Sequence, residues 1–160
     1  MIETASTADG AAAAAERHTY ILFSVAGTTY AVNSAQVLHI EMVEHVTAVP
    51  NAPPSVEGVV FSRGQVVPVI NLRARFGFER IPLDLRTRLV VVQSENRRVG
   101  LMADDAREFI TIADAAIRPP NEAIRGLSGD YVAGVAALGE RIVLVLNIRE
   151  VIEAVPTTVA

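Results

Sequence analysis

The chain contains no cysteine, no lysine and no tryptophan among its 160 residues. Without cysteine it forms no disulfide, no thiolate metal site and no thiol nucleophile. All 14 basic residues are therefore arginine, and the absence of lysine excludes a Walker-type phosphate loop and Schiff-base chemistry. Several large classes of enzyme are thus removed before any motif is considered.

Charge and apolar content indicate a compact globular protein that does not bind polyanions. The net charge is -4 and the isoelectric point ≈ 5.4, whereas nucleic-acid-binding domains usually carry a basic surface. Apolar residues make up 51% of the chain, yet no uninterrupted apolar run approaches the roughly 18 residues of a membrane span. We therefore expect no nucleic-acid partner and no direct membrane insertion.

The two ends of the chain differ in composition from the rest. Residues 1–17 are small and polar, and their run of five alanines is too short and too weakly apolar for the core of a signal peptide. We expect a disordered N-terminal tail over residues 1–17, a folded domain over residues 18–154 and a frayed C-terminal tail over residues 155–160.

Between these tails the sequence has the punctuation of strands and turns. Short Val-, Ile- and Leu-rich runs are separated by Gly, Asn and Pro, and hairpins are predicted over residues 20–33 and 89–103. A shift of 76 positions places residues 58–73 on residues 134–149 with glycine, valine and Asn-x-Arg positions matched, and a shift of 69 aligns the first hairpins in hydrophobic pattern only. The sequence therefore predicts a duplication in which each half carries a hairpin, a mixed segment and a second hairpin.

Short helical turns are expected at four places. Ser34 is the predicted cap of a turn after the first hairpin, and Asp104 or Asp105 would cap the corresponding turn in the second half. Two more turns are predicted at residues 73–76 and near residues 148–153. Helix is otherwise scarce.

Four to five short strands in each half, apolar on one face, suit two small closed barrels better than one flat sheet. The expected fold class is all-β, with two barrel lobes related by a pseudo-two-fold. The residues that should point inward are Val67, Val69, Val143 and Val145.

Catalytic and metal-binding patterns find little support. The spacing of His18, His39 and His45 matches no metal-binding motif, and we expect exposed or interface imidazoles. Asp104 and Asp105 are adjacent, so their carboxylates would point to different sides of a strand or turn rather than act as a pair. No catalytic residue, metal site or cofactor is predicted.

Arg63 is the most informative charged residue. It lies in the sequence FSRGQ, where a tight turn between two apolar strands would present the guanidinium outward and Gly64 would supply a positive φ. Two interpretations stay open: a solvated turn arginine, or an anchor that offers its guanidinium to a partner.

Three motifs together resemble a known family. They are GVVFSRGQVVPVINLR over residues 58–73, VGLMAD from residue 99, and YVAGVAALGERIVLVLNI from residue 131. In this combination the chain, over about residues 19–152, resembles the CheW coupling proteins of bacterial chemosensory arrays. The resemblance implies a non-enzymatic adaptor built from two SH3-like five-stranded β-barrels around a shared core.

The resemblance also implies partners and a location. CheW proteins link the cytoplasmic tips of methyl-accepting chemoreceptors to the regulatory domain of a CheA-type histidine kinase, in the cytoplasm at membrane-associated receptor arrays. By this similarity receptor-tip helices would dock in a groove between the barrels. The residues implied are Val37, Arg63, Gly64, Ala106 and Phe109.

Four positions depart from the family pattern. His39 stands where a glutamate is frequent and should line the same groove, Phe61 and Ser62 replace a common Asn-Leu, and Ala106 replaces a larger aliphatic residue. Such changes alter partner choice, because specificity is a difference of affinities. Three alternatives therefore stay open: a divergent system that controls surface motility, biofilm or development; a CheW-like protein that has lost one usual partner; and a small-ligand-binding β-barrel sensor.

Overall fold

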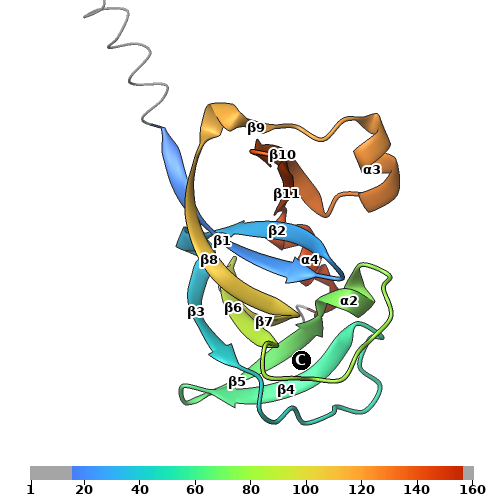
Figure 1. Cartoon of the computed structure of the whole chain (residues 1–160). Helices are drawn as coiled ribbons and strands as arrows, with labels where there is room; N and C mark the ends of the chain where they lie inside the picture. The colour runs from blue at the N-terminus through green and yellow to red at the C-terminus, as the bar shows by residue number, and fades with distance from the viewer. Residues whose placement is uncertain (1–15, 157–160) are drawn as a thin grey trace, which may run out of the picture.

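The computed structural model describes residues 16–156, which form two β-sheets joined by an apolar core (Figure 1). The first lobe is a five-stranded sheet in the order β3-β6-β7-β5-β4. Its strands are β3 (Val37–Met42), β4 (Val56–Ser62), β5 (Gln65–Asn71), β6 (Arg88–Ser94) and β7 (Arg97–Ala103). The second lobe is a six-stranded sheet in the order β8-β1-β2-β11-β10-β9. Its strands are β1 (Arg17–Val25), β2 (Thr28–Asn33), β8 (Asp105–Ala113), β9 (Ile117–Arg118), β10 (Val132–Leu138) and β11 (Arg141–Leu146). The predicted all-β class is confirmed.

Each lobe takes hairpins from both halves of the sequence. Strand β7 pairs in parallel with β5, placing Gly100 opposite Val69, and β2 pairs in parallel with β11, placing Ala31 opposite Val145. The two halves exchange their first hairpins, an arrangement that the sequence pattern does not indicate. The exchanged hairpins are covered on both faces, which explains why their strands contain uninterrupted apolar runs such as LVVV instead of alternating polar residues.

The 76-residue repeat is visible element by element. Strand β4 shifted by 76 positions has the bounds of β10, and the α2 helix (Leu72–Arg75) shifted in the same way has the bounds of the α4 helix (Ile148–Val151). The backbone N–H of Asn71 donates to Ser55 O and that of Asn147 donates to Tyr131 O, both over 2.8 Å. The predicted duplication is confirmed at the level of single hydrogen bonds.

In each lobe a short stretch of chain connects the two edges of the sheet. In the second lobe β8 pairs with β1 and β9 pairs with β10, and β8 and β9 are joined only by the 3-10 turn η2 (Asp114–Ala116). In the first lobe the chain after β3 reaches β4 through an antiparallel bridge in which Thr47 and Val59 exchange backbone hydrogen bonds of 2.9 and 2.8 Å. Val59 and Val135 are 76 positions apart, so the two closures are equivalent.

Three apolar clusters fill the protein. One occupies the first lobe and includes Val67 and Val69, and a second occupies the second lobe and includes Val143 and Val145. The largest lies between the lobes and combines residues of both sheets with those of α2, α4 and η3 (Ile152–Ala154). All four valines are buried, as predicted.

The helical turns differ from the prediction in three places. The 3-10 turn η1 (Ser34–Gln36) is capped by Asn33, whose side chain accepts from Ala35 N, and not by Ser34. Asp104 caps no helix, because the chain enters β8 directly at Asp105 and the second-half turn forms later as η2. The α3 helix (Glu122–Ser128) was not predicted; Asn121 caps it by accepting from Ile124 N, an N-cap signal present in the sequence RPPNEAI.

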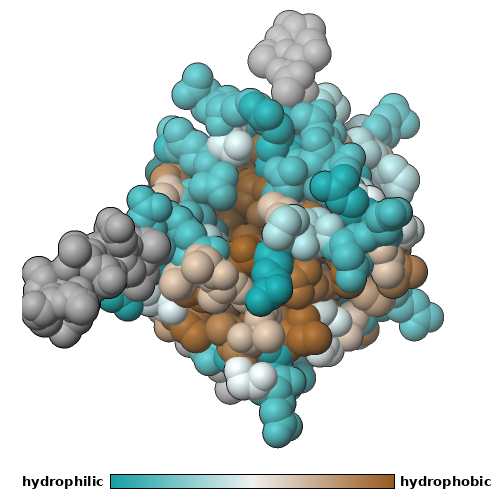
Figure 2. All heavy atoms as spheres, turned by 90° about the horizontal axis from the view of Figure 1, so that it is seen from above, coloured by the Kyte–Doolittle hydropathy of each residue, from teal (hydrophilic) through white to brown (hydrophobic). Residues whose placement is uncertain are grey.

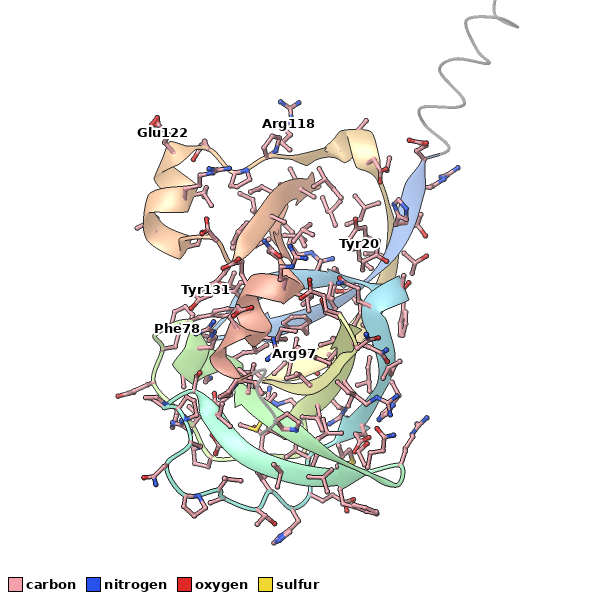
Figure 3. The ribbon with its side chains drawn as sticks, turned by 180° about the vertical axis from the view of Figure 1, so that it is seen from behind. Tyr20, Phe78, Arg97, Arg118, Glu122 and Tyr131 are labelled. Carbon is pink, nitrogen blue, oxygen red and sulfur yellow. The ribbon has the colours of Figure 1, made fainter. Side chains whose placement is uncertain are left out.

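Polar and aromatic contacts join the lobes beside the shared core. The Arg75 side chain donates to the backbone carbonyls of Val151 and Glu150 over 3.0 and 2.8 Å. Its guanidinium carbon lies 4.8 Å from the ring centre of Tyr131, which is near Phe78 in Figure 3. The α2 helix of the first repeat is therefore fastened to the α4 helix of the second.

The predicted tails lie largely outside the described residues. Residues 1–15 and 157–160 are not described, and Arg17 already belongs to β1. Among residues 16–156 no helix has the length and apolar character needed to cross a bilayer.

Candidate partner-binding surface

The β4–β5 hairpin ends in a two-residue turn formed by Arg63 and Gly64. Ser62 pairs with Gln65, and the two turn residues have φ values of 48° and 82°, as a type I′ turn requires. The tight turn is as predicted, and Arg63 itself also has the positive φ that is uncommon for a residue with a side chain. Arg63 is exposed, and across residues 16–156, the Arg107 side chain apart, its guanidinium has no hydrogen-bond or ion-pair partner.

An apolar pair lies beside this turn on the outer face of the hairpin. Phe61 is opposite Val66, and they are 74% and 66% exposed. Their neighbours Val60 and Val67 point into the lobe and are buried. The outward direction of Phe61 and Val66 was not predicted, because adjacent apolar residues on each strand hide the alternation of faces.

Val37 and Ala106 occupy equivalent positions on β3 and β8, which are edge strands of the two sheets and are called the closing strands below. Val37 on β3 pairs with Val92 and Ala106 on β8 pairs with Phe23, and these two partners are matched by the 69-residue shift. Both Val37 and Ala106 are partly buried and pack against the core between the lobes. The structure therefore places these two predicted residues at the edge of the apolar cluster between the lobes, which is called the seam below.

His39 is placed differently from the other predicted residues. Its side chain is only 11% exposed, and its Nε2 lies 2.6 Å from Glu41 Oε2 and 3.0 Å from Ser62 Oγ. The Ser62 hydroxyl donates to the same Glu41 oxygen over 2.8 Å. Glu41 was not identified from the sequence, although its position two residues after His39 on one strand predicts a shared face.

Phe109 lies further along β8, opposite Ile21, and is 66% exposed. Its neighbour Glu108 accepts two hydrogen bonds from the Arg141 guanidinium over 2.9 and 3.3 Å. These bonds lower the pKa of Glu108 and raise the pKa of Arg141. An exposed aromatic ring thus stands next to a fixed ion pair on this strand.

The predicted residues form one side of the molecule rather than one compact site. Strands β3 and β8 and the turn of the β4–β5 hairpin lie along the same side in both Figure 1 and Figure 3. Val37 and Ala106 both pack against the apolar cluster between the lobes, and His39 is connected through Ser62 to the base of the Arg63 turn.

Two open hollows lie at opposite ends of the protein. One of about 370 Å³ adjoins the hairpin and is lined by residues that include Glu41, Met42, Glu44 and Phe61. The other, of about 650 Å³, lies between η2, β9 and β10–β11, at the end where Figure 2 shows apolar surface among polar side chains. The apolar clusters fill the interiors of the two lobes. The described residues therefore give no specific support to the alternative of a ligand-binding β-barrel sensor.

Comparisons with known proteins identify the family of this chain. The CheW-like domain family matches residues 19–155. The chemotaxis protein CheW of Klebsiella aerogenes is 28% identical over 135 residues, covering 84% of this chain and 81% of that protein. A probable chemotaxis protein CheW of Rhizobium etli is 30% identical over 131 residues, covering 81% and 83%. The crystal structure of the scaffolding protein TtCheW from Thermoanaerobacter tengcongensis superposes with a TM-score of 0.75 at 26% identity, covering 81% of this chain and 88% of that one. The chain therefore belongs to the CheW-like family of non-enzymatic chemotaxis adaptors.

Proposed function

We propose that this protein couples the cytoplasmic tips of methyl-accepting chemoreceptors to the regulatory domain of a CheA-type histidine kinase. The observation that carries the proposal is the exposed guanidinium of Arg63, unpaired within the described part of the chain and flanked by the exposed Phe61 and Val66. Arginine and aromatic side chains that stand together without internal partners are typical of the energetic centre of a protein interface.

The surface for the receptor helix is assigned to the side that β3 and β8 share. Val37 and Ala106 border the apolar seam, and Phe109 extends an exposed ring from the same strand as Ala106. A helix lying in a groove needs apolar contacts for burial and a few polar groups to set its register. Arg63 and the backbone of Gly64 would supply the polar edge.

The departures from the family pattern favour a partner adapted to this chain. Ala106 leaves more room at the seam than a larger aliphatic residue would, and Phe61 enlarges the apolar area beside Arg63. A divergent receptor and kinase pair, acting in motility, biofilm or development and located at membrane-associated arrays in the cytoplasm, is the setting that we propose.

The proposal is tested by calorimetric titration against a receptor-tip fragment and a kinase regulatory domain. Arg63→Ala should weaken binding by about 2 kcal/mol or more, as hot-spot arginines do, while changing the free energy of unfolding by no more than about 0.5 kcal/mol. Arg118→Ala is the matched control, since this arginine is exposed on β9 at the opposite end of the molecule.

Equal affinities of Arg63→Ala and the parent protein for both partners would refute the assignment of this surface. Equal losses in the Arg63 and Arg118 variants would refute it as well, because a general charge effect would then explain the result.

A further inference from the structure

Each lobe has a polar link between its closing strand and the base of a hairpin turn. In the first lobe the link joins His39 and Glu41 on β3 to Ser62, the last residue of β4 before the Arg63 turn. In the second lobe Glu108 on β8 accepts from Arg141, the first residue of β11 after its turn. The two links occupy matching places in the duplicated fold.

The strand registers establish this match. His39 pairs with Val91 and Glu108 pairs with Leu22, and Val91 and Leu22 are 69 positions apart. A bulge separates each of these pairs from the preceding pair, between Val37 and His39 in one lobe and at Leu22 in the other.

The chemistry of the two links differs. The Glu108–Arg141 pair is exposed and stays charged throughout the neutral pH range, because the hydrogen bonds between its members lower one pKa and raise the other. The first-lobe link contains an imidazole, the side chain whose charge normally changes between pH 5 and 8. Its Nε2 faces a carboxylate at 2.6 Å, and the His39 and Glu41 side chains are 11% and 31% exposed.

We propose that His39, Glu41 and Ser62 form a protonation-sensitive tie that positions the Arg63 turn. With the imidazolium present, Nε2–H donates to Glu41 as a charge-assisted bond that fixes the carboxylate within β3. Ser62 donates to the same oxygen, so the fixed carboxylate holds β4 against β3. With a neutral ring, only the tautomer protonated at Nε2 keeps that bond, without the opposite charge. Glu41 and Ser62 are then positioning residues for Arg63, which connects the tie to the function proposed above.

The side chains around His39 come from three strands. Glu41 comes from the same strand, Ser62 comes from β4, and the partner strand β6 contributes the uncharged Val91. Glu44 and His45 line the hollow that Glu41 also lines, and Arg63 follows Ser62 in the chain. The groups within hydrogen-bond distance of the ring nitrogen are therefore the Glu41 carboxylate and the Ser62 hydroxyl.

Amide hydrogen exchange of the free protein tests the tie without any partner. Protection factors, corrected for intrinsic exchange, should be measured for Phe61 to Val66 between pH 5.5 and pH 8. In the parent protein the protection factors should fall by about tenfold as the pH rises from 5.5 to 8. This is about the strength that a hydrogen bond gains when it becomes charge-assisted. In His39→Gln and in Ser62→Ala they should be lower at pH 5.5 and nearly independent of pH.

Glu108→Gln is the matched control, because it loosens the equivalent link of the other lobe. It should leave the pH dependence at the Arg63 turn unchanged and lower protection only near Leu138 and Arg141. A flat profile in the parent protein, or the same tenfold fall in His39→Gln, would overturn the tie.

A binding arm separates this inference from the proposed function on which it rests. Affinity for the kinase regulatory domain and the receptor-tip fragment should be titrated at pH 6 and pH 8 in the parent protein and in His39→Gln. A severalfold loss at pH 8 that His39→Gln lacks supports both proposals. Exchange that depends on pH together with binding that does not would uphold the tie and refute the role of the hairpin in binding.

Discussion

Gly58 and Gly134 hold the same place in the two lobes, each against the segment that closes its sheet. A Cβ at Gly58 would lie 2.1 Å from the backbone oxygen of Thr47, and one at Gly134 would lie 2.4 Å from Ile117 Cγ2 and 3.3 Å from Arg118 O. Each glycine also follows a bulge in its strand. The repeated glycine is therefore a requirement of sheet closure.

Replacing Gly58 with alanine should be strongly destabilising. Its φ of 146° disfavours any side chain, and the atom that a Cβ would meet belongs to the backbone and cannot turn away. We expect Gly58→Ala to lower the free energy of unfolding by at least about 3 kcal/mol. Gly134→Ala should cost less, because the first obstacle is a side chain. Urea unfolding of both variants measures the difference.

Gly126 provides the control for these substitutions. It lies inside the α3 helix, and a Cβ added there would meet nothing within 4 Å, so Gly126→Ala should stabilise the protein by about 0.5–1 kcal/mol. A Gly58→Ala variant as stable as Gly126→Ala would contradict the closure argument.

Asp104 should make stability depend on pH in the acid range. Burial opposes its ionisation, but hydrogen bonds from Arg73 and from the Ala26 N–H outweigh burial, and the pKa of Asp104 lies below its ordinary value. A lowered folded-state pKa stabilises the fold above the unfolded value of about 4, and this contribution is lost as the pH falls through the folded-state pKa.

The comparison is between the parent protein and Asp104→Asn, which keeps an acceptor for Ala26. At pH 7 the variant should be less stable by about 1.5–3 kcal/mol, the range for hydrogen bonds to charged groups. The difference in urea midpoint between the two proteins should be similar at pH 7 and pH 5 and smaller at pH 3. A gap that stays constant down to pH 3 would argue against ionisation as its cause.

The sequence was informative where structure is local or repeated. The hairpins, the 76-residue duplication and the inward valines follow from patterns within short windows, and the turn at Arg63 follows from its glycine neighbour. The exchange of hairpins did not follow, because parallel pairing between distant strands leaves no mark in either strand alone. Asp104 was misassigned for the same reason, since its partners Arg73 and Ala26 lie 31 and 78 positions away.

His39→Glu would introduce a second carboxylate beside Glu41 and should destabilise the first lobe. The new side chain would face Glu41, which already accepts from Ser62 and lies 2.6 Å from the imidazole it would replace. Two carboxylates this close together repel, so we expect the free energy of unfolding to fall by about 1–3 kcal/mol at pH 7, and the loss should shrink as one of them is protonated. The double variant His39→Glu/Glu41→Gln should recover much of this loss in urea unfolding.

Phe61 should matter for binding and not for folding. With 74% of its surface exposed, Phe61→Ser should change the free energy of unfolding by less than about 0.5 kcal/mol. If the hairpin contacts a partner, the same change should weaken binding by about 2 kcal/mol, as the loss of an aromatic anchor does. Leu127→Ser, on α3 and 88% exposed, is the matched apolar control in the same titration.

Arg75 should be the most sensitive polar residue at the junction of the lobes. It donates to the backbone carbonyls of Val151 and Glu150 and stacks on Tyr131, so one side chain satisfies the end of α4 and covers an aromatic ring. Arg75→Ala should lower the free energy of unfolding by about 2–3 kcal/mol, since two acceptors lose a charged donor and the ring loses its cation. The stability of Arg75→Lys should lie between those of the parent protein and Arg75→Ala, because an ammonium group cannot reproduce the two-pronged hydrogen bonding of the guanidinium. Arg86→Ala, which removes only an exposed pair with Asp84 at 3.4 Å, should change stability by less than about 0.5 kcal/mol. Equal urea midpoints for the Arg75 and Arg86 alanine variants would mean that the shared apolar core alone holds the lobes together.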